Sequence, residues 1–204
     1  EKDLSQAFLW YQRSSSQGQP YAAYSIAQMY RYGEYVTKDN DTAQRYYKQA
    51  LSGFLKIESD DMANDDLFYK LGQMFNLGLG TDSDVTKAIE YFRRSAEMNN
   101  KNGLFEYGKA LLTGEHIPQD TDSAVKLLEK AVKLKNSNAK RFLALEYISG
   151  EHLEQDFEKG IALLTECADS GDVIASYRLG KIYLQGEIMP QNLDKAEKYL
   201  LLAE

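Results

Sequence analysis

Residues Asp84–Asp120 read DVTKAIEYFRRSAEMNNKNGLFEYGKALLTGEHIPQD, and this stretch carries the signals of two helices and the turns around them. Ala88, the pair Tyr91 and Phe92, and Ser95 follow one another at intervals of three or four residues. Residues at that spacing share one face of a helix, because an α-helix has about 3.6 residues per turn. The stretch therefore predicts a first helix with one apolar face.

A second apolar stripe follows in the same stretch, made by Phe105, Tyr107 and Leu111. Gly108 lies inside this stripe, although a glycine in a helix interior costs about 1 kcal/mol relative to alanine. We infer that a neighbouring helix approaches closely at this glycine. Gly114 stands where helices commonly end in a left-handed residue, so the stretch predicts a second helix that stops there.

The same unit recurs along the whole chain. The small residue that opens each first-helix stripe returns after 36 residues, except for one interval of 45 residues, and the series is Ala7, Ala43, Ala88, Ala124, Gly160 and Ala196. Large apolar residues stand three and four positions after each member of the series. We expect these to pack against neighbouring helices, in particular Trp10, Tyr11, Tyr46, Tyr91, Phe92, Leu163 and Tyr199.

Three further columns repeat with the unit. Small residues occupy the middle of each second-helix stripe, at Ala27, Gly72, Gly108, Ala144 and Gly180. A glycine follows each second helix, at Gly33, Gly78, Gly114, Gly150 and Gly186. Residues that cap helix amino termini precede each new first helix, at Asp39, Asp84, Asp120, Asp156 and Asn192.

These columns predict an all-α fold, a right-handed superhelical α/α solenoid of helix–turn–helix repeats, forming a single domain over residues 1–204. The expected units are 7–42, 43–87, 88–123, 124–159 and 160–195, with a partial unit at 196–204. The unit 43–87 holds a nine-residue insertion with acidic residues around 54–66, which either extends the first helix or forms an acidic loop. Because apolar Leu200, Leu201 and Leu202 lie in the partial unit, we expect the chain to be a fragment of a longer one.

The columns resemble a known family motif, A-x-x-W/Y-Y/F-x-x-A-A followed by L-G-x-x-Y-x-x-G-x-x-V-x-x-D. The matching residues are Trp10–Tyr11, Leu71–Gly72, Tyr91–Phe92, Ile117–Asp120 and Leu179–Tyr183. The chain is similar to the Sel-one-like repeat family, which is related to the tetratricopeptide repeats, and it departs from the motif at Leu127 and Leu128. The resemblance implies an adaptor or scaffold and supplies no catalytic residues.

The charge and composition of the chain exclude several classes of function. The net charge is −7, with 31 acidic and 24 basic residues, so the summed field does not favour nucleic acid. No apolar run approaches the roughly 18–20 residues of a membrane helix, and we expect no direct membrane insertion. We expect neither a cofactor nor catalysis, because no phosphate-binding loop, nucleophile elbow or histidine–carboxylate–nucleophile set is present.

The residues most often used in catalysis or metal binding have structural interpretations here. His116 and His152 occupy equivalent loops one repeat apart, on the order of 10 Å from helix packing distances. Zinc needs both nitrogens at about 2 Å, so we expect these histidines to be exposed loop residues. Cys167 lies in a column of small residues, and we expect a buried spacer.

The exposed positions of the first helices are the candidate partner-binding site. In the related repeat families these positions line a concave face, and here they include the basic residues Arg45, Lys48, Arg93, Arg94, Lys126 and Lys130. The hypothesis is a protein or peptide partner with an acidic segment, since arginine pairs well with carboxylates. The simpler interpretation is a solvated helix face, with Glu90 pairing to Arg94 and Glu129 to Lys133. The alternative function is an interaction module of a larger enzyme or membrane-anchored machine whose chemistry lies elsewhere.

Overall fold

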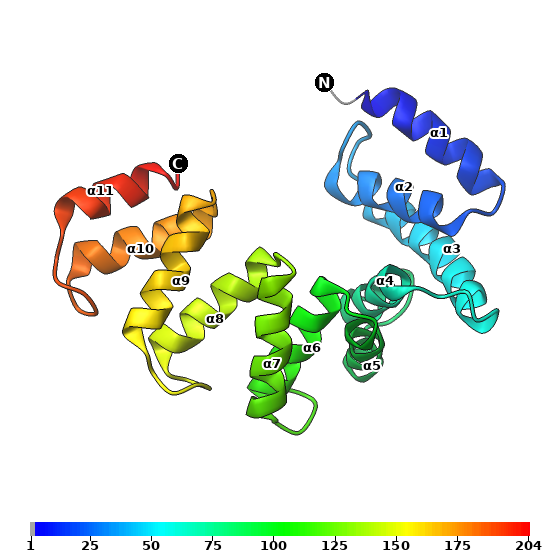
Figure 1. The fold of residues 1–204 in the computed structure, drawn as a ribbon. Helices are drawn as coiled ribbons and strands as arrows, with labels where there is room; N and C mark the ends of the chain where they lie inside the picture. The colour runs from blue at the N-terminus through cyan, green and yellow to red at the C-terminus, as the bar shows by residue number, and fades with distance from the viewer. Residues whose placement is uncertain (1–2) are drawn as a thin grey trace. The chain divides into compact units, whose positions relative to one another are not determined.

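The computed structural model describes residues 3–204, and these form eleven helices and their connecting loops (Figure 1). The helices are α1 (Leu4–Ser16), α2 (Pro20–Tyr32), α3 (Asn40–Ser59), α4 (Asp65–Leu77), α5 (Val85–Glu97), α6 (Lys101–Thr113), α7 (Thr121–Lys133), α8 (Ser137–Ser149), α9 (Phe157–Asp169), α10 (Val173–Gln185) and α11 (Leu193–Leu201). The all-α prediction is confirmed.

The chain divides into two compact units, Glu1–Gly103 and Leu104–Glu204. Unit 1 contains α1 to α5, and unit 2 contains α7 to α11. Within each unit the most extensive packing joins a second helix to the first helix of the next repeat. The pairs are α2 with α3 and α4 with α5 in unit 1, and α8 with α9 and α10 with α11 in unit 2.

The loop between the two helices of each pair contains the predicted glycine that ends the first helix and the predicted residue that caps the second. Gly78 ends α4 with a φ of 63°, and its backbone N–H donates to the carbonyl of Met74. The loop ends at Asp84, whose backbone N–H donates to the carbonyl of Phe75 at 2.9 Å. The side chain of Asp84 then caps α5 by accepting a hydrogen bond from the backbone N–H of Lys87. The same glycine and cap positions recur along the chain, so these predictions are confirmed.

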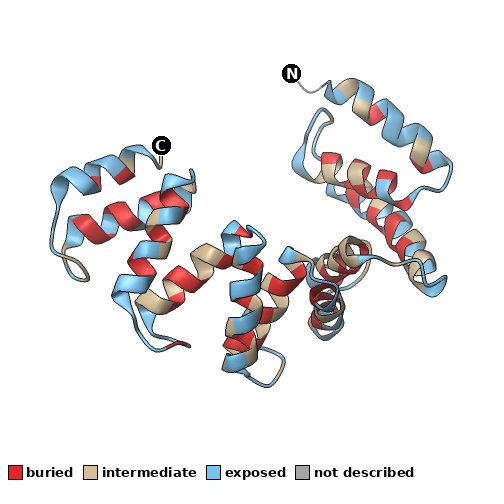
Figure 2. Ribbon diagram, in the orientation of Figure 1, coloured by how far each residue is buried: buried red, intermediate tan, exposed pale blue. Residues whose placement is uncertain are grey.

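The predicted packing of the large apolar column holds for most of its members. Tyr91, Phe92 and Tyr199 are buried, while Tyr46 and Leu163 are partly buried against core clusters. Figure 2 shows many buried residues on α2 and few on α1.

The prediction is wrong for the first repeat, where Trp10 is 63% exposed and Tyr11 is 37% exposed. Their equivalents in the next repeat, Tyr46 and Tyr47, pack on α2, with Tyr46 stacked on Tyr30. No helix precedes α1 in the described residues, so Trp10 and Tyr11 have no corresponding helix to pack against.

The insertion in unit 43–87 mainly lengthens a helix. α3 has 20 residues, whereas each of the helices α1, α2 and α4–α10 has 13. A short loop from Asp60 to Asn64 follows, and Asn64 caps α4. The extension brings Glu58 to α5, where its carboxylate accepts a hydrogen bond from Tyr91 at 2.8 Å and pairs with Arg94.

Candidate partner-binding site

Two of the predicted basic residues in unit 1 lie on the exposed side of α3. Arg45 and Lys48 are both exposed, and the guanidinium of Arg45 donates to the hydroxyl of Thr42 at 2.7 Å. This contact lies within the same helix and leaves the side chain at the surface. The two residues are three positions apart and therefore share a face of α3.

The other two basic residues of unit 1 are held in internal ion pairs. Arg93 pairs with Glu90 at 2.6 Å and with Glu97, both on α5. The sequence analysis paired Arg94 with Glu90, but in the structure Arg94 pairs with Glu58. That prediction was wrong because the α3 extension places Glu58 beside α5, a contact between residues 36 positions apart.

A contact with an aromatic ring also holds the Arg94 side chain in place. Its guanidinium carbon lies 3.9 Å from the centroid of the Phe68 ring, in a cation–π contact. The hydrogen bond from Arg93 is the largest of the influences that lower the pKa of Glu90, and it outweighs the opposing effect of burial. Arg94 thus contributes to the packing of α5 against α3 and α4, whereas the ion pairs of Arg93 lie within α5.

The remaining predicted residues, Lys126 and Lys130, lie in unit 2. Both are exposed on α7, one turn apart. The candidate residues therefore form two separate basic faces, one on α3 in unit 1 and one on α7 in unit 2.

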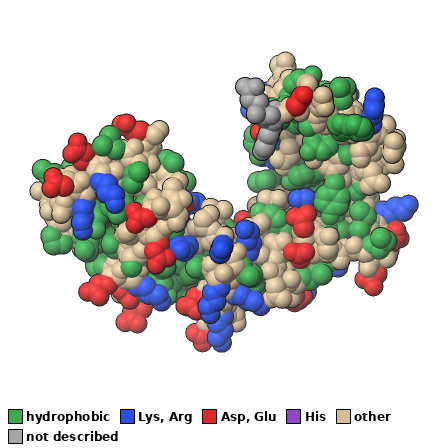
Figure 3. All heavy atoms as spheres, turned by 45° about the horizontal axis from the view of Figure 1, so that its top comes forward, with side chains coloured by type: hydrophobic (Ala, Val, Ile, Leu, Met, Phe, Trp, Pro, Cys, Tyr) green, Lys and Arg blue, Asp and Glu red, His purple; other side chains and the backbone are tan. Residues whose placement is uncertain are grey.

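Unit 1 also contains a groove that the sequence analysis did not predict. Its volume is about 640 Å³, and α1, α2 and one residue of α4 supply most of its lining. Figure 3 shows hydrophobic side chains, in green, over much of the face that unit 1 presents in that view. The lining residues include Ala7 and Tyr11 of α1, Tyr21, Tyr24 and Gln28 of α2, and Lys70 of α4. Tyr11, which the sequence analysis expected to be packed against a helix, is exposed and lines this groove.

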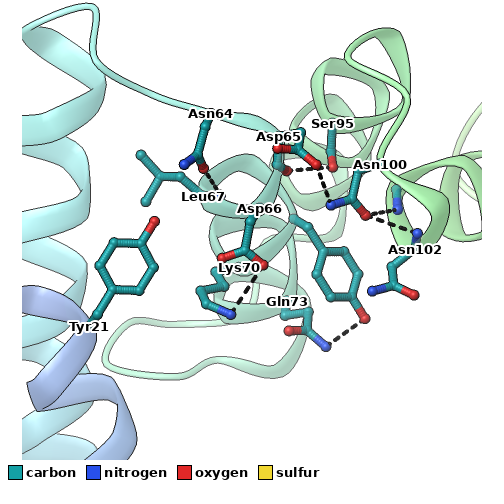
Figure 4. A network of polar contacts seen from close by, with 12 residues as sticks. Tyr21, Asn64, Asp65, Asp66, Leu67, Lys70, Gln73, Ser95, Asn100 and Asn102 are labelled. Atoms are coloured by element: carbon teal, nitrogen blue, oxygen red, sulfur yellow. Dashed lines mark hydrogen bonds and ion pairs between the residues drawn. The ribbon is translucent and has the colours of Figure 1, made fainter.

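The α4 side of the groove combines aromatic and charged groups. The ammonium of Lys70 lies 5.4 Å from the centroid of the Tyr24 ring and 3.4 Å from a carboxylate oxygen of Asp66. Burial and then the neighbouring phenol of Tyr47 raise the pKa of Tyr24 to about 12. Burial and the charges of Asp66 and Asp65 also raise the pKa of Tyr21, which points toward α4 in Figure 4.

A polar network fixes the start of α4 beside this groove (Figure 4). The hydroxyl of Ser95 donates to the carbonyl of Asp65 at 2.7 Å, and the amide of Asn100 donates to the Asp65 carboxylate at 2.9 Å. The side-chain oxygen Oδ1 of Asn100 accepts from the backbone N–H groups of Asn102 and Gly103. These bonds tie the start of α4 to α5 and to the start of α6, so the network has a structural role.

The remaining candidates for chemistry are also structural. Cys167 is buried as expected, and burial is the largest cause that raises the pKa of its thiol. His116 is exposed as expected, but His152 is half-buried and its Nδ1 lies 3.0 Å from the buried carboxylate of Glu146. In residues 3–204 no group of three or more metal-ligating side chains comes together, and no helix is long and apolar enough to cross a bilayer.

The fold and surfaces define the class of protein: a helical repeat solenoid. The Sel1 repeat model matches residues 1–19, 20–53, 69–100, 102–136, 137–172 and 173–203. The chain belongs to the Sel1 repeat family. The longer matches each combine the second helix of one unit with the first helix of the next. The match 20–53 contains α2 and α3 as far as residue 53, whereas 1–19 contains α1 alone.

Solved structures share the fold over 96–100% of the chain. A Sel1 repeat protein from Oxalobacter formigenes is 24% identical, with a TM-score of 0.70 over 100% of this chain and 80% of that one. A protective antigen of uropathogenic Escherichia coli strains, displaying an SLR fold, is 26% identical, with a TM-score of 0.65 over 100% of this chain and 42% of its own. An immunity protein of Pseudomonas aeruginosa is 18% identical, with a TM-score of 0.63 over 96% of this chain and 72% of its own. No curated protein sequence matches the chain.

Proposed function

We propose that this chain is a scaffold or adaptor that binds a partner protein, and that the exposed basic residues of α3 or those of α7 contact an acidic segment of the partner. Sel1 repeat proteins are generally protein-interaction modules. The observation that carries the proposal is the exposure of Arg45, Lys48, Lys126 and Lys130 in a chain whose net charge is −7. Such local basic faces attract a carboxylate-rich segment despite the overall charge.

Arg93 and Arg94 contribute least to this interaction. An acidic segment that approached them would have to displace Glu58, Glu90 or Glu97 from an existing ion pair. The Arg94 pair is also partly buried, so breaking it would cost more than breaking an exposed pair. The proposal therefore rests on four of the six predicted residues.

Affinity capture with quantitative mass spectrometry tests this function. Wild-type protein is compared with the double variant Arg45→Glu and Lys48→Glu, with the double variant Lys126→Glu and Lys130→Glu, and with Lys56→Glu as a control. Lys56 is exposed on α3, eight positions beyond Lys48, and is not one of the four proposed contact residues. We expect at least one double variant to lose a captured protein that wild type and the control retain; identical captured sets would overturn the proposed contact.

A further inference from the structure

Positive charge gathers on α7 and the start of α8, although the chain is acidic overall. Residues 126–141 contain one acid, Glu129, and six basic residues, which are Lys126, Lys130, Lys133, Lys135, Lys140 and Arg141. The first three of these are exposed, and their spacing of four and three positions places them on one face of α7. Lys133 is the last residue of α7, so this face ends at the turn that joins α7 to α8.

A pocket of unit 2 lies at that turn. Its volume is about 520 Å³, and its walls come from the α7–α8 turn, the first turn of α8 and the α9–α10 turn. Lys135 and Lys140 contribute ammonium groups to the lining, and Ser137 and Ser170 contribute hydroxyls. Both α8 and α10 begin at the pocket, and the positive end of a helix dipole favours anions.

Asp172 contributes a carboxylate to the lining, and this carboxylate is already paired. One of its oxygens accepts a hydrogen bond from the backbone N–H of Ala175, and the other pairs with Arg141. The Asp172 side chain is 11% exposed, so its charge is largely satisfied inside the protein. The ammonium groups of Lys135 and Lys140 therefore determine how the pocket acts on a ligand.

Lys140 already holds a carboxylate at the pocket. Its ammonium lies 2.8 Å from a carboxylate oxygen of Glu166, whose side chain is 61% exposed. Exposed ion pairs contribute little to stability, because water solvates and screens both groups. A carboxylate of another protein can therefore replace that of Glu166 at small cost.

Lys135 has an unusual backbone conformation for a lysine. Its φ is 60°, in the left-handed region that glycine adopts most readily. The equivalent turn positions hold Gly18, Asn99 and Gly171, which also have positive φ, and asparagine tolerates this region better than most residues. The turn itself does not require a lysine, and the side chain that stands there is exposed and lines the pocket.

We propose that this pocket binds an aspartate or glutamate side chain of an acidic partner segment, and that Lys135 and Lys140 hold its carboxylate. The rest of the segment lies along Lys126, Lys130 and Lys133. Charge complementarity specifies this occupant, because basic groups continue from the face of α7 into the pocket. The inference rests on the proposed function, and it selects α7 as the face that makes the contact.

The probe for the pocket is a synthetic peptide of six glutamates that carries a fluorophore. A peptide of six glutamines with the same fluorophore is the control ligand. Fluorescence anisotropy should show saturable binding of the glutamate peptide, weaker at higher salt, and no binding of the glutamine peptide. Carbodiimide coupling followed by mass spectrometry should join the peptide to Lys135 or Lys140, because the reagent links a carboxylate to an amine that it contacts.

Three substitutions locate the contact. Lys135→Asn keeps a residue suited to the turn, so affinity for the glutamate peptide should fall about tenfold or more while the melting temperature stays unchanged. Glu166→Gln should strengthen binding, because it removes the carboxylate that competes for Lys140. Lys181→Gln removes one positive charge from an exposed position of α10 that does not line the pocket, and it should leave affinity near the wild-type value.

Equal affinity of wild type and Lys135→Asn would overturn the proposal, and so would coupling only to lysines outside the pocket. An equal loss in Lys181→Gln and Lys135→Asn would show general attraction to a polyanion and would overturn it as well. A partner lost from the Lys126→Glu and Lys130→Glu variant, with equal peptide affinity in wild type and Lys135→Asn, would overturn the pocket and leave the proposed function standing. Identical captured sets, with the peptide coupled to Lys135, would do the reverse.

Discussion

Gly72 of α4 lies directly against the ring of Phe92 of α5, and a Cβ built on the glycine would stand 2.5 Å from two ring carbons. This contact explains why a helix tolerates a glycine in its interior. The conformational cost of the glycine is offset by the close approach of two helices, which buries Phe92 and Leu71. Gly108 has the same relationship to Leu128.

Gly72→Leu and Gly108→Leu should each destabilise the unit that contains them. Overpacking costs about 1–3 kcal/mol, and loss of the close helix contact adds to it. Thermal unfolding followed by circular dichroism checks this, with the exposed Lys101→Leu as control. Equal melting temperatures for the glycine variants and the control would show that the small column is not a packing column.

His152 should matter to stability while His116 should not, although both lie in a Gly-Glu-His tripeptide. Removing the imidazole in His152→Ala leaves the buried Glu146 carboxylate without this partner, at a cost of about 1–3 kcal/mol. His116→Ala removes an exposed side chain. Urea unfolding of the two variants measures the difference, and similar losses in both would contradict the assigned role of the Glu146 contact.

Stability should fall at alkaline pH because of Tyr24. Its pKa is raised to about 12 in the folded chain, compared with about 10 in the unfolded chain. The unfolded state therefore loses its proton first as the pH rises. The stability contributed by the neutral phenol is fully present below about pH 10 and is lost between about pH 10 and 12. The loss is about 2–3 kcal/mol, at roughly 1.4 kcal/mol for each pH unit.

Tyr24→Phe provides the control for this pH dependence, because it keeps the ring and removes the titrating group. Urea unfolding at pH 8 and at pH 11 should show a smaller pH effect in the variant than in wild type. An identical pH effect would show that other groups dominate the alkaline response.

Cys167 should be inert in the folded protein. It is 3% exposed, and burial raises the pKa of its thiol, so little reactive thiolate reaches solvent. A thiol reagent should label it slowly in buffer and rapidly in denaturant. Rapid labelling of the folded protein would show that the α9 core opens locally.

The features that the sequence predicted correctly depend on local chemistry. Glycine and aspartate at the helix ends form hydrogen bonds with residues only a few positions away in the sequence. The capping roles of Gly78 and Asp84 could therefore be predicted without knowledge of the fold. The Arg94–Glu58 pair was missed because it joins residues far apart in sequence through an extended helix whose length the periodicity did not settle. The exposure of Trp10 was missed because the column shows which side chains can receive a helix, and not whether a helix is there.

The proposed function depends on the binding of a partner protein to the basic face of α3 or of α7, and this binding can be measured with a purified partner. A captured protein is titrated calorimetrically into wild type, into each double charge-reversal variant and into Lys56→Glu, which reverses one exposed lysine that is not among the four proposed residues. We expect at least a tenfold loss of affinity in one double variant, wild-type affinity in Lys56→Glu, and weaker wild-type binding at higher salt. Equal affinity of all four proteins, insensitive to salt, would contradict it.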